Sequence, residues 1–281
     1  ASGKRNIKPA SACVNDLFSS RLCGIVNDTL IIIPTYNERE NVRAIAAAVF
    51  ASSPDVDLLF VDDNSPDGTG AIADEMAAAD PRVKVMHRAE KNGLGRAYIA
   101  GFKWALERQY EFICEMDADF SHNPDDIPTL RAAAKTAGLV LGSRYVNGVR
   151  VINWPLRRLI LSRGAGVYVK FVTGMSFTDP TGGFKCFRRC VLETIPLDQI
   201  ESSGYSFQVE MTHMAWRIGC RIVEVPIVFE ERRSGASKMS KNIIFEALIM
   251  VWKLYFRARF SRAPVCRVQP GGARFKCCQP R

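Results

Sequence analysis

Short apolar runs alternate with longer segments of helical pattern between residues 30 and 143. Five runs have the length and the branched or aromatic side chains of β-strands: 30–34, 57–61, 83–87, 112–116 and 139–143. Four segments between them have helical spacing: 39–52, 69–79, 94–108 and 125–136. Strands separated by helices are typical of βαβ units. We therefore expect an α/β fold with a mostly parallel central sheet and helices on both faces.

The regular alternation ends after residue 144. The pattern then predicts helices over 153–174, 205–218 and 242–257 and a strand over 221–229. Residues 1–28 are polar and aperiodic, and the end of the chain is rich in Pro, Gly and Arg. We therefore expect four parts, of which the first and last are flexible or disordered. They are an N-terminal extension (1–28), an α/β domain (29–232), a basic amphipathic segment (233–260) and a basic tail (261–281).

Polar residues follow four of the five predicted strands. The clusters are Pro34 to Glu38, Asp62 to Gly68, Asp117 to Asp119, and Gly142 to Arg144. Each cluster alone is compatible with ordinary turn chemistry. In a parallel α/β sheet, however, ligands bind at the carboxyl ends of the strands. Four clusters at one edge therefore predict a binding site there.

Asp117 and Asp119 stand two residues apart at the end of the fourth strand. On a continuing strand both would face the same side, and a turn could bring them onto one ligand. Paired carboxylates suit Mg²⁺ or Mn²⁺, with waters and substrate phosphates completing the coordination. The alternative is a helix start, with Asp119 or Ser121 as N-cap before Pro124.

The segment from Asp63 to Gly68 resembles the start of a calcium-binding loop. A strand precedes it, however, and Gly70 and Asp74 occupy positions that need an aliphatic residue and a glutamate. We interpret it as a loop that holds a nucleoside, with Asp63 accepting a hydrogen bond from the base or ribose. The chain has no phosphate-binding G-x-x-x-x-G-K motif, and Gly93-Leu94-Gly95 is only a weak dinucleotide signal.

The basic character of the chain lies near its C-terminus. The formal net charge is +9. From residue 232 onward, twelve Lys or Arg stand against one acid, Glu246, which gives that segment +11 and leaves −2 for the rest. Such a block favours an anionic membrane, nucleic acid or protein partner. Nucleic acid is the weakest of these alternatives, because the cations adjoin apolar helices without motifs that stack on bases or read a groove.

The predicted helix over 242–257 is strongly amphipathic. Its polar residues Asn242, Glu246, Lys253 and Arg257 fall within about 60° of one another at about 100° per residue. It is about 22 Å long, against about 30 Å for a hydrocarbon core. It could lie on a membrane, dock on a membrane subunit or pack on the α/β domain. The flanking cations favour the membrane, and 156–171, with its arginines, is a candidate second contact.

Neither a spanning segment nor a signal peptide is recognisable in the sequence. The nine cysteines contain no C-x-x-C pair and no zinc-ligand spacing. We therefore expect a protein that is neither secreted nor integral, with reduced thiols in a cytosolic compartment.

The ordered set of motifs resembles a known enzyme family. The segments are IIIPTYNERENV (31–42), FVDDNSPDGTG (60–70), NGLGRAYIAGF (92–102), EMDADFSHNP (115–124), GSRY (142–145), SRGAG (162–166), DPTGGF (179–184) and ERRSGASK (231–238). Together they resemble a polyprenol-phosphate mannosyltransferase of the dolichol-phosphate mannose synthase type. That family belongs to glycosyltransferase family 2 and has the GT-A fold, which is Rossmann-like. The resemblance covers about residues 30–257 and leaves both termini outside.

The resemblance implies roles for individual residues. The positions that hold the GDP part of GDP-mannose match Pro34, Tyr36, Glu38, Val61 and Asp63. Asp117 and Asp119, with Ala118 between them, match the D-x-D motif that carries Mg²⁺ or Mn²⁺ on the diphosphate. Ser121 stands where some relatives use Gln as a further metal ligand. The cationic positions around the phosphates match Arg144, Arg232 and Lys238, and an acceptor-phosphate site matches Arg158 and Ser162 together with Arg144.

The resemblance also implies a reaction. Mannose would pass from GDP-mannose to a polyprenyl or dolichyl phosphate with inversion, and Asp117, Asp119, Arg144 and Arg232 would carry the catalysis. The enzyme would be peripheral on the cytosolic face of a membrane, the endoplasmic reticulum in a eukaryote or the inner membrane in a prokaryote, with small membrane subunits as candidate partners and no nucleic acid. The alternatives are transfer of glucose or another sugar, and a non-catalytic nucleotide-sugar-binding subunit.

Overall fold

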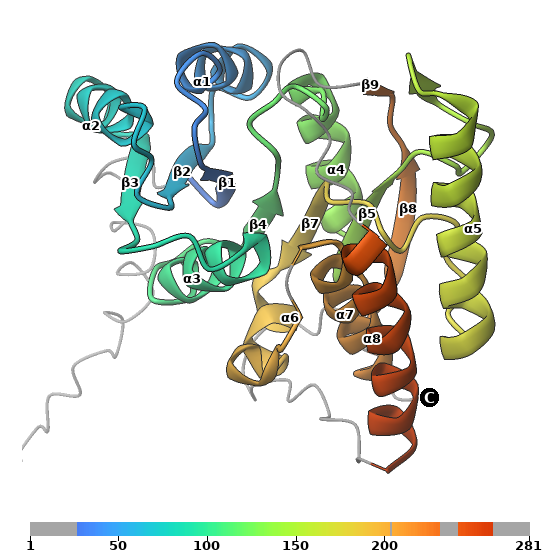
Figure 1. Ribbon diagram of the computed structural model, residues 1–281. Helices are drawn as coiled ribbons and strands as arrows, with labels where there is room; N and C mark the ends of the chain where they lie inside the picture. The colour runs from blue at the N-terminus through green and yellow to red at the C-terminus, as the bar shows by residue number, and fades with distance from the viewer. Residues whose placement is uncertain (1–26, 203, 231–240, 261–281) are drawn as a thin grey trace, which may run out of the picture.

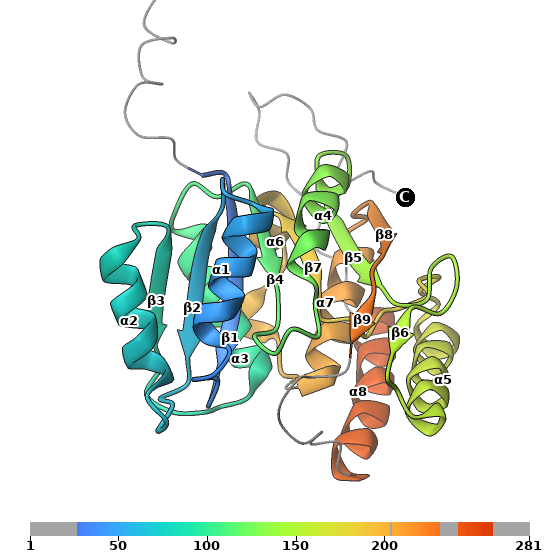
Figure 2. The same cartoon turned by 90° about the horizontal axis from the view of Figure 1, so that it is seen from above.

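A seven-stranded sheet forms the centre of the molecule. The computed structural model describes residues 27–202, 204–230 and 241–260. The strand order is β3-β2-β1-β4-β7-β5-β8, and Figure 2 shows it from left to right. The strands are β1 (Thr29–Thr35), β2 (Asp57–Asp62), β3 (Val83–His87), β4 (Phe112–Glu115), β5 (Leu139–Ser143), β7 (Lys185–Arg188) and β8 (Ile222–Pro226). Every neighbouring pair is parallel except the two made by β7, which is antiparallel to β4 and β5.

Helices cover both faces of this sheet (Figure 1). One face packs against α1 (Val42–Ser52), α2 (Thr69–Ala79) and α4 (Ile127–Ala134), the last preceded by the 3₁₀ helix η2 (Pro124–Asp126). The other face packs against α3 (Leu94–Leu106), α6 (Arg189–Thr194) and α7 (Gly204–Arg217), with the 3₁₀ helix η3 (Leu197–Gln199) before α7. Alternate residues of β1 enter the two cores, Leu30 and Ile32 on one side and Ile31 and Ile33 on the other. This double burial explains the uninterrupted apolar run of that strand.

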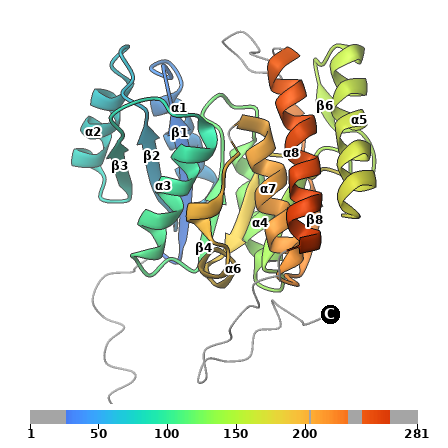
Figure 3. The same cartoon turned by 60° about the horizontal axis from the view of Figure 1, so that its bottom comes forward.

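Two long helices lie near the β8 end of the sheet (Figure 2). They are α5 (Leu156–Thr173) and α8 (Lys241–Phe260), and Figure 3 shows them side by side. A small third core joins them to α7 through residues such as Val169, Met250 and Leu254. Two short strands, β6 (Val151–Ile152) and β9 (Phe229–Glu230), pair in parallel nearby. Within the described part of the chain, no helix has the length and apolar character needed to cross a membrane.

The expected fold class is confirmed, and all five strands predicted in the first half of the chain are present. The first helix begins at Val42 rather than at residue 39, because residues 38–41 form a turn closed by the bond from the Asn41 amide to the Glu38 carbonyl. The strand predicted over 221–229 is divided into β8 and β9. The sequence pattern missed β7, since its four residues include the buried cations Lys185 and Arg188.

Candidate active site

The loops after β1 and β2 are bonded to each other at the carboxyl edge of the sheet. Thr35 Oγ1 donates to Asp62 Oδ1 at 3.1 Å, and the Glu38 amide donates to Thr69 Oγ1 at 3.0 Å. Asp67 accepts from the Thr69 amide and hydroxyl at 3.0 and 2.6 Å. Asp62 and Asp67 therefore stabilise the two loops. The residues predicted to bind the nucleotide lie around these acids and differ in how far their side chains are exposed.

Four of those residues lie at the ends of β1 and β2 or in the loop after β1. Pro34 and Val61 are paired in the β1–β2 register. The Val61 side chain is fully buried in the core below the loops, so only its backbone faces this edge. Tyr36 lies under Lys91, whose Nζ is 3.6 Å from the ring centroid. Glu38 is half-buried and accepts from Asn41 Nδ2 at 2.8 Å.

Asp63 is paired with an arginine rather than exposed to solvent. Arg88 Nη1 donates to its Oδ1 at 2.7 Å. Burial raises the pKa of Asp63, and the charge and hydrogen bond of Arg88 partly offset this effect. Arg88 follows β3, the one predicted strand whose end we did not include among the polar clusters. A cation directly after the strand was the signal that could have identified it.

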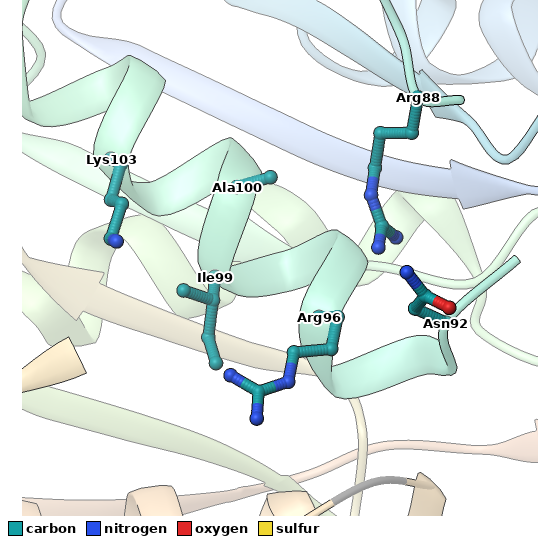
Figure 4. Close-up of a pocket in the computed structure, with 6 residues that line it drawn as sticks. All are labelled: Arg88, Asn92, Arg96, Ile99, Ala100 and Lys103. Atoms are coloured by element: carbon teal, nitrogen blue, oxygen red, sulfur yellow. The ribbon is translucent and has the colours of Figure 1, made fainter. Parts of the chain in front are cut away.

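Arg88 also lines a cavity beside α3 (Figure 4). The cavity has a volume of about 410 Å³. Its lining residues are Arg88, Asn92, Arg96, Ile99, Ala100 and Lys103. Those numbered 96 to 103 project from one side of α3, while the opposite side of the helix packs on the sheet. Three cations line this hollow, and two of them are paired with acids, Arg88 with Asp63 and Lys103 with Asp198.

The Asp117-Ala118-Asp119 segment follows β4 and turns sharply. Tyr98 Oη donates to Asp117 Oδ1 at 3.4 Å, and burial followed by the Asp117 charge holds the pKa of Tyr98 well above its ordinary value. The Ser121 amide donates to Asp119 Oδ1 at 3.0 Å. Phe120 has a φ of +60°, which is unusual for a bulky residue and requires support from the surrounding structure.

The helix-start interpretation of these aspartates is wrong. Asn123, not Asp119 or Ser121, caps the following 3₁₀ helix, because its side chain accepts from the Asp125 amide at 3.1 Å. Asp119 is only 7% exposed. The carboxylates therefore terminate a strand at the candidate site instead of starting a helix.

The buried side chain of His122 stabilises this turn. Its Nδ1 accepts from the Asp117 amide at 3.1 Å, and its ring stacks on Phe184 with the centroids 5.0 Å apart. Burial is the main effect that lowers the pKa of His122. An imidazole held neutral in this way orients the loop and is poorly suited to carry a proton to solvent.

A buried polar network lies beneath the same turn. Glu115 and Lys185 are register partners across β4 and β7, and both are fully buried. Lys185 Nζ donates to the backbone oxygen and the Oε1 of Gln208 at 2.7 and 2.6 Å. Burial raises the pKa of Glu115 to about 7 and lowers that of Lys185 to about 8. The network ties β4, β7 and α7 together below Asp117.

Arg144 directly follows β5, and its guanidinium forms hydrogen bonds with Asp179. Its Nε and Nη2 donate to the two carboxylate oxygens at 2.7 and 2.6 Å, and Nη2 also donates to Thr181 Oγ1 at 2.9 Å. Sequence reasoning named Arg144 but not the acid that orients it. The acid belongs to the DPTGGF segment, which lies 35 residues further along the chain.

The predicted acceptor-phosphate residues gather around two aromatic rings. Arg158 lies 4.2 Å from the Trp154 ring centroid, and Arg144 lies 5.5 Å from the same centroid. Tyr145 Oη donates to Ser162 Oγ at 2.7 Å. The structure therefore brings Arg144, Arg158 and Ser162 into one neighbourhood. Arg232 and Lys238, the other two predicted cations, lie outside the described residues.

Phe229 connects this acceptor cluster to the aspartate turn. Its ring centroid is 5.6 Å from that of His122 and 5.3 Å from that of Trp154. The Arg144 guanidinium lies 5.4 Å from the same ring. Two aromatic contacts thus separate the carboxylates after β4 from the arginines after β5.

The donor set after β4 fits a metal whose coordination a substrate completes. Among the described residues, no group of three or more His, Cys, Asp or Glu side chains could hold a metal ion. Asp117 and Asp119 supply carboxylate oxygens, and within the described ranges Ser121 Oγ is buried without a hydrogen-bond partner. Two carboxylates with one spare oxygen suit Mg²⁺ or Mn²⁺ on a diphosphate better than a closed protein cage.

Relatives with similar sequences are glycosyltransferases. A polyprenol monophosphomannose synthase from Mycolicibacterium smegmatis is 52% identical over 237 residues, which cover 84% of this chain and 89% of that protein. An undecaprenyl-phosphate mannosyltransferase from Micrococcus luteus is 50% identical over 82% of this chain and 95% of that protein. A dolichol-phosphate mannosyltransferase from Pyrococcus furiosus is 36% identical over 80% of this chain and 62% of that protein. The family resemblance seen in the sequence is therefore confirmed.

Solved structures share the fold. Glucosyl-3-phosphoglycerate synthase from Mycobacterium tuberculosis, in complex with Mn²⁺, UDP and phosphoglyceric acid, has a TM-score of 0.56 at 15% identity, covering 85% of this chain and 79% of that chain. A mannosyltransferase from Pyrobaculum calidifontis, in complex with GDP-Man and Mn²⁺, has a TM-score of 0.50 at 17% identity, covering 82% and 73%. The GT-A fold is confirmed by these neighbours. The glycosyl transferase family 2 model matches residues 30–195. The chain is therefore a glycosyltransferase and belongs to glycosyl transferase family 2.

Proposed function

We propose that this enzyme transfers mannose from GDP-mannose to a polyprenyl phosphate with inversion at the anomeric carbon. The observation that carries the proposal is the junction at Phe229, where the aspartate turn adjoins a cluster of arginines. Carboxylates suit a metal-bound diphosphate donor, and arginines suit a phosphate acceptor. Three similar proteins are named as mannosyltransferases or mannose synthases of polyprenyl-type phosphates.

The acceptor needs little proton transfer. A phosphate monoester has a second pKa of about 6, so its attacking oxygen is largely ionised at neutral pH. That oxygen forms the new bond to the anomeric carbon as the bond to the β-phosphate of GDP breaks on the opposite face. The main task of the residues is therefore to align two anions. Arg144 and Arg158 would orient the incoming phosphate, with Ser162 beside them.

The donor would lie across the loops after β1, β2 and β4. Tyr36, Glu38 and Asp63, with the backbone at Pro34 and Val61, would hold the GDP part, next to the cationic hollow beside Arg88. Asp117 and Asp119 would hold Mg²⁺ or Mn²⁺ with the diphosphate, and Ser121 is a candidate for a further oxygen. When bound, the cation would supply neutralising charge to the departing diphosphate.

A position on the cytosolic face of a membrane would give the enzyme access to its lipid acceptor. The outer sides of α5 and α8 expose large apolar residues: Leu156, Ile160, Leu161, Val167, Phe171, Leu248, Ile249, Trp252 and Phe256. Exposed cations, including Arg157, Arg163, Lys170 and Lys253, lie on the same two helices. Apolar residues mixed with cations suit an anionic lipid surface. The inner sides of both helices pack on the domain, so packing on the domain and contact with a membrane are compatible for the last helix.

The donor assignment can be tested directly. Labelled GDP-mannose or UDP-glucose is incubated with the protein, a polyprenyl phosphate and Mg²⁺ or Mn²⁺, and label that becomes extractable into organic solvent is measured. We expect label from GDP-mannose. Extraction of label from UDP-glucose alone would contradict the mannose assignment.

The metal assignment needs a variant and its control. Asp119→Asn should reduce the transfer rate by about a hundredfold or more, because a carboxylate ligand is lost. Asp125→Asn changes an exposed aspartate a few residues later and should keep the wild-type rate. A full rate in Asp119→Asn would show that this residue does not bind the metal.

A further inference from the structure

Asp179 forms a dense set of bonds with Arg144. It accepts from the Arg144 amide at 3.0 Å as well as from Nε and Nη2, so a single carboxylate fixes both the backbone and the guanidinium. Thr181 Oγ1 donates to Asp179 Oδ1 at 3.1 Å. Asp179 is only 1% exposed. Burial would raise its pKa, but the charge and hydrogen bonds of Arg144 outweigh burial and lower it, so Asp179 stays ionised.

Asp179 is itself held in place by the neighbouring strand. Its amide donates to Glu224 Oε1 of β8 at 2.9 Å. The Thr178 amide and hydroxyl donate to the same carboxylate at 2.9 and 2.7 Å. A Cβ at Gly182 would lie 3.0 Å from the Gly142 carbonyl oxygen, so the loop packs closely against β5. The aspartate therefore sits on a rigid support.

An arginine at a phosphate site benefits from such support. A free arginine side chain has many rotamers, and binding would otherwise have to remove that rotamer entropy. Arg144 is restrained by Asp179 and is also near the rings of Tyr145, Trp154 and Phe229, at 5.3 to 5.5 Å from their centroids. Arg158, next to the same tryptophan, adds positive charge to the cluster.

We propose that Asp179 is a positioning residue that holds the Arg144 guanidinium in the orientation needed for the acceptor phosphate. The inference rests on the proposed polyprenyl phosphate site and assigns to the DPTGGF segment the task of ordering that site. It does not depend on the identity of the transferred sugar. Glu224 contributes through Asp179, by fixing the loop on which the aspartate stands.

The test compares two isosteric variants. Asp179→Asn removes the charge and one acceptor from the pair with Arg144. The control, Asp80→Asn, changes an aspartate that accepts from the Arg82 amide, Nε and Nη2 in the same pattern on the surface. The readouts are the Kd for farnesyl phosphate, a short polyprenyl phosphate, by isothermal titration, and the KM values for acceptor and sugar nucleotide.

We expect Asp179→Asn to weaken farnesyl phosphate binding and raise the acceptor KM by about tenfold or more, because a charge-assisted pair is lost. The KM for the sugar nucleotide should change less than about twofold, and Asp80→Asn should leave all three constants unchanged. Equal rises in both KM values, or an unchanged Kd, would overturn the proposal. Farnesyl phosphate binding needs no sugar donor, so failure of the GDP-mannose assignment would appear separately in the transfer assay.

A double-variant cycle separates positioning from a general structural role. If Asp179 acts through Arg144, then Asp179→Asn should add little to the weakening of farnesyl phosphate binding that Arg144→Gln already causes. Additive effects would show that Asp179 acts independently. Should Asp179→Asn fail to fold, Thr181→Val removes only the neighbouring hydroxyl. It should weaken binding about threefold, and unchanged binding in this variant would also overturn the proposal.

Discussion

The carboxylates at the strand ends divide into two groups by their hydrogen bonds. Asp62, Asp67 and Asp119 accept bonds from residues of their own loops, and Asp62 also accepts from Thr35 at the end of β1. Asp63 instead pairs with a distant arginine. Residue type is the same in all four positions, so the role of each aspartate depends on its partners.

At the residue scale, His213 on α7 predicts a pH dependence of stability. Burial, followed by the nearby Arg217 charge, lowers the pKa of His213 to about 4 from an ordinary value of 6.5. The unfolded chain therefore binds a proton between pH 6.5 and pH 4 that the folded protein excludes. The contribution of His213 to the free energy of unfolding is complete above pH 6.5. It decreases as the pH falls and has lost about 3 kcal/mol at pH 4.

The measurement is urea unfolding of the wild type and of His213→Gln between pH 7 and pH 4. The stability difference between the two proteins should shrink as the pH falls, because only the wild type carries this proton-excluding ring. His87→Gln, at an exposed histidine paired with Asp74, is the matched control. A pH slope that persists in His213→Gln but disappears in His87→Gln would contradict the assignment.

At the element scale, the packing of α3 on β1 depends on the small size of Gly101. A Cβ at this position would lie 2.8 Å from Ile32 Cγ2. The close approach brings α3, which carries Tyr98 and two of the three cationic residues of the cavity, tightly onto the sheet. Gly164, inside α5, has open space where a Cβ would be placed.

The same substitution should therefore have opposite effects in the two helices. Gly101→Ala should destabilise the protein by about 1–3 kcal/mol through overpacking. Gly164→Ala should stabilise it by about 0.5–1 kcal/mol, because alanine is the better helix former. Chemical denaturation of both variants measures the two changes. Equal changes of the same sign would refute the packing argument.

At the scale of the whole molecule, one side of the structure is more apolar than a soluble surface requires. Phe171 on α5 is 85% exposed, and Trp252 and Phe256 on α8 stack on each other in the open. The helices lie side by side, so the exposed residues form a two-helix surface. A surface of this kind, with cations among the apolar residues, fits a lipid bilayer.

Removing its apolar side chains should weaken membrane binding. Phe171→Ser combined with Trp252→Ser should reduce binding to vesicles of phosphatidylglycerol and phosphatidylcholine by about tenfold or more. Leu94→Ser, at an exposed leucine on α3, should not. Sedimentation with vesicles measures both. Unchanged binding of the double variant, or equal loss in the control, would exclude this surface as the membrane contact.

Local patterns predicted much of the candidate site. Asp117, Asp119 and Arg144 follow predicted strands directly, so strand periodicity and the rule for strand ends placed them at one edge. The roles of Arg158 and Ser162 depended on family resemblance, since helical spacing alone gives an arginine on α5 no function. The metal hypothesis followed from the paired carboxylates themselves. The metal-binding and substrate-binding roles of these residues stay predictions.

Other residues could not be predicted because their role comes from contacts between distant segments. Asp179 is 35 residues from the arginine it holds, and Phe229 lies 107 residues from His122 along the chain but contacts it. Lys185 is buried because β7 lies between β4 and β5 in the sheet. A cation in a central strand is stable only with buried partners, and these lie on other elements.

By itself, the sequence determined the α/β class, the five strands of the first half and the edge where the polar residues gather, because periodicity and strand ends are local properties. Only the tertiary structure decided which carboxylates form hydrogen bonds within their own loops and which acid orients Arg144. It also decided that β7 runs antiparallel to its neighbours. These depend on hydrogen bonds and packing between residues far apart along the chain, for which spacing in the sequence carries no information.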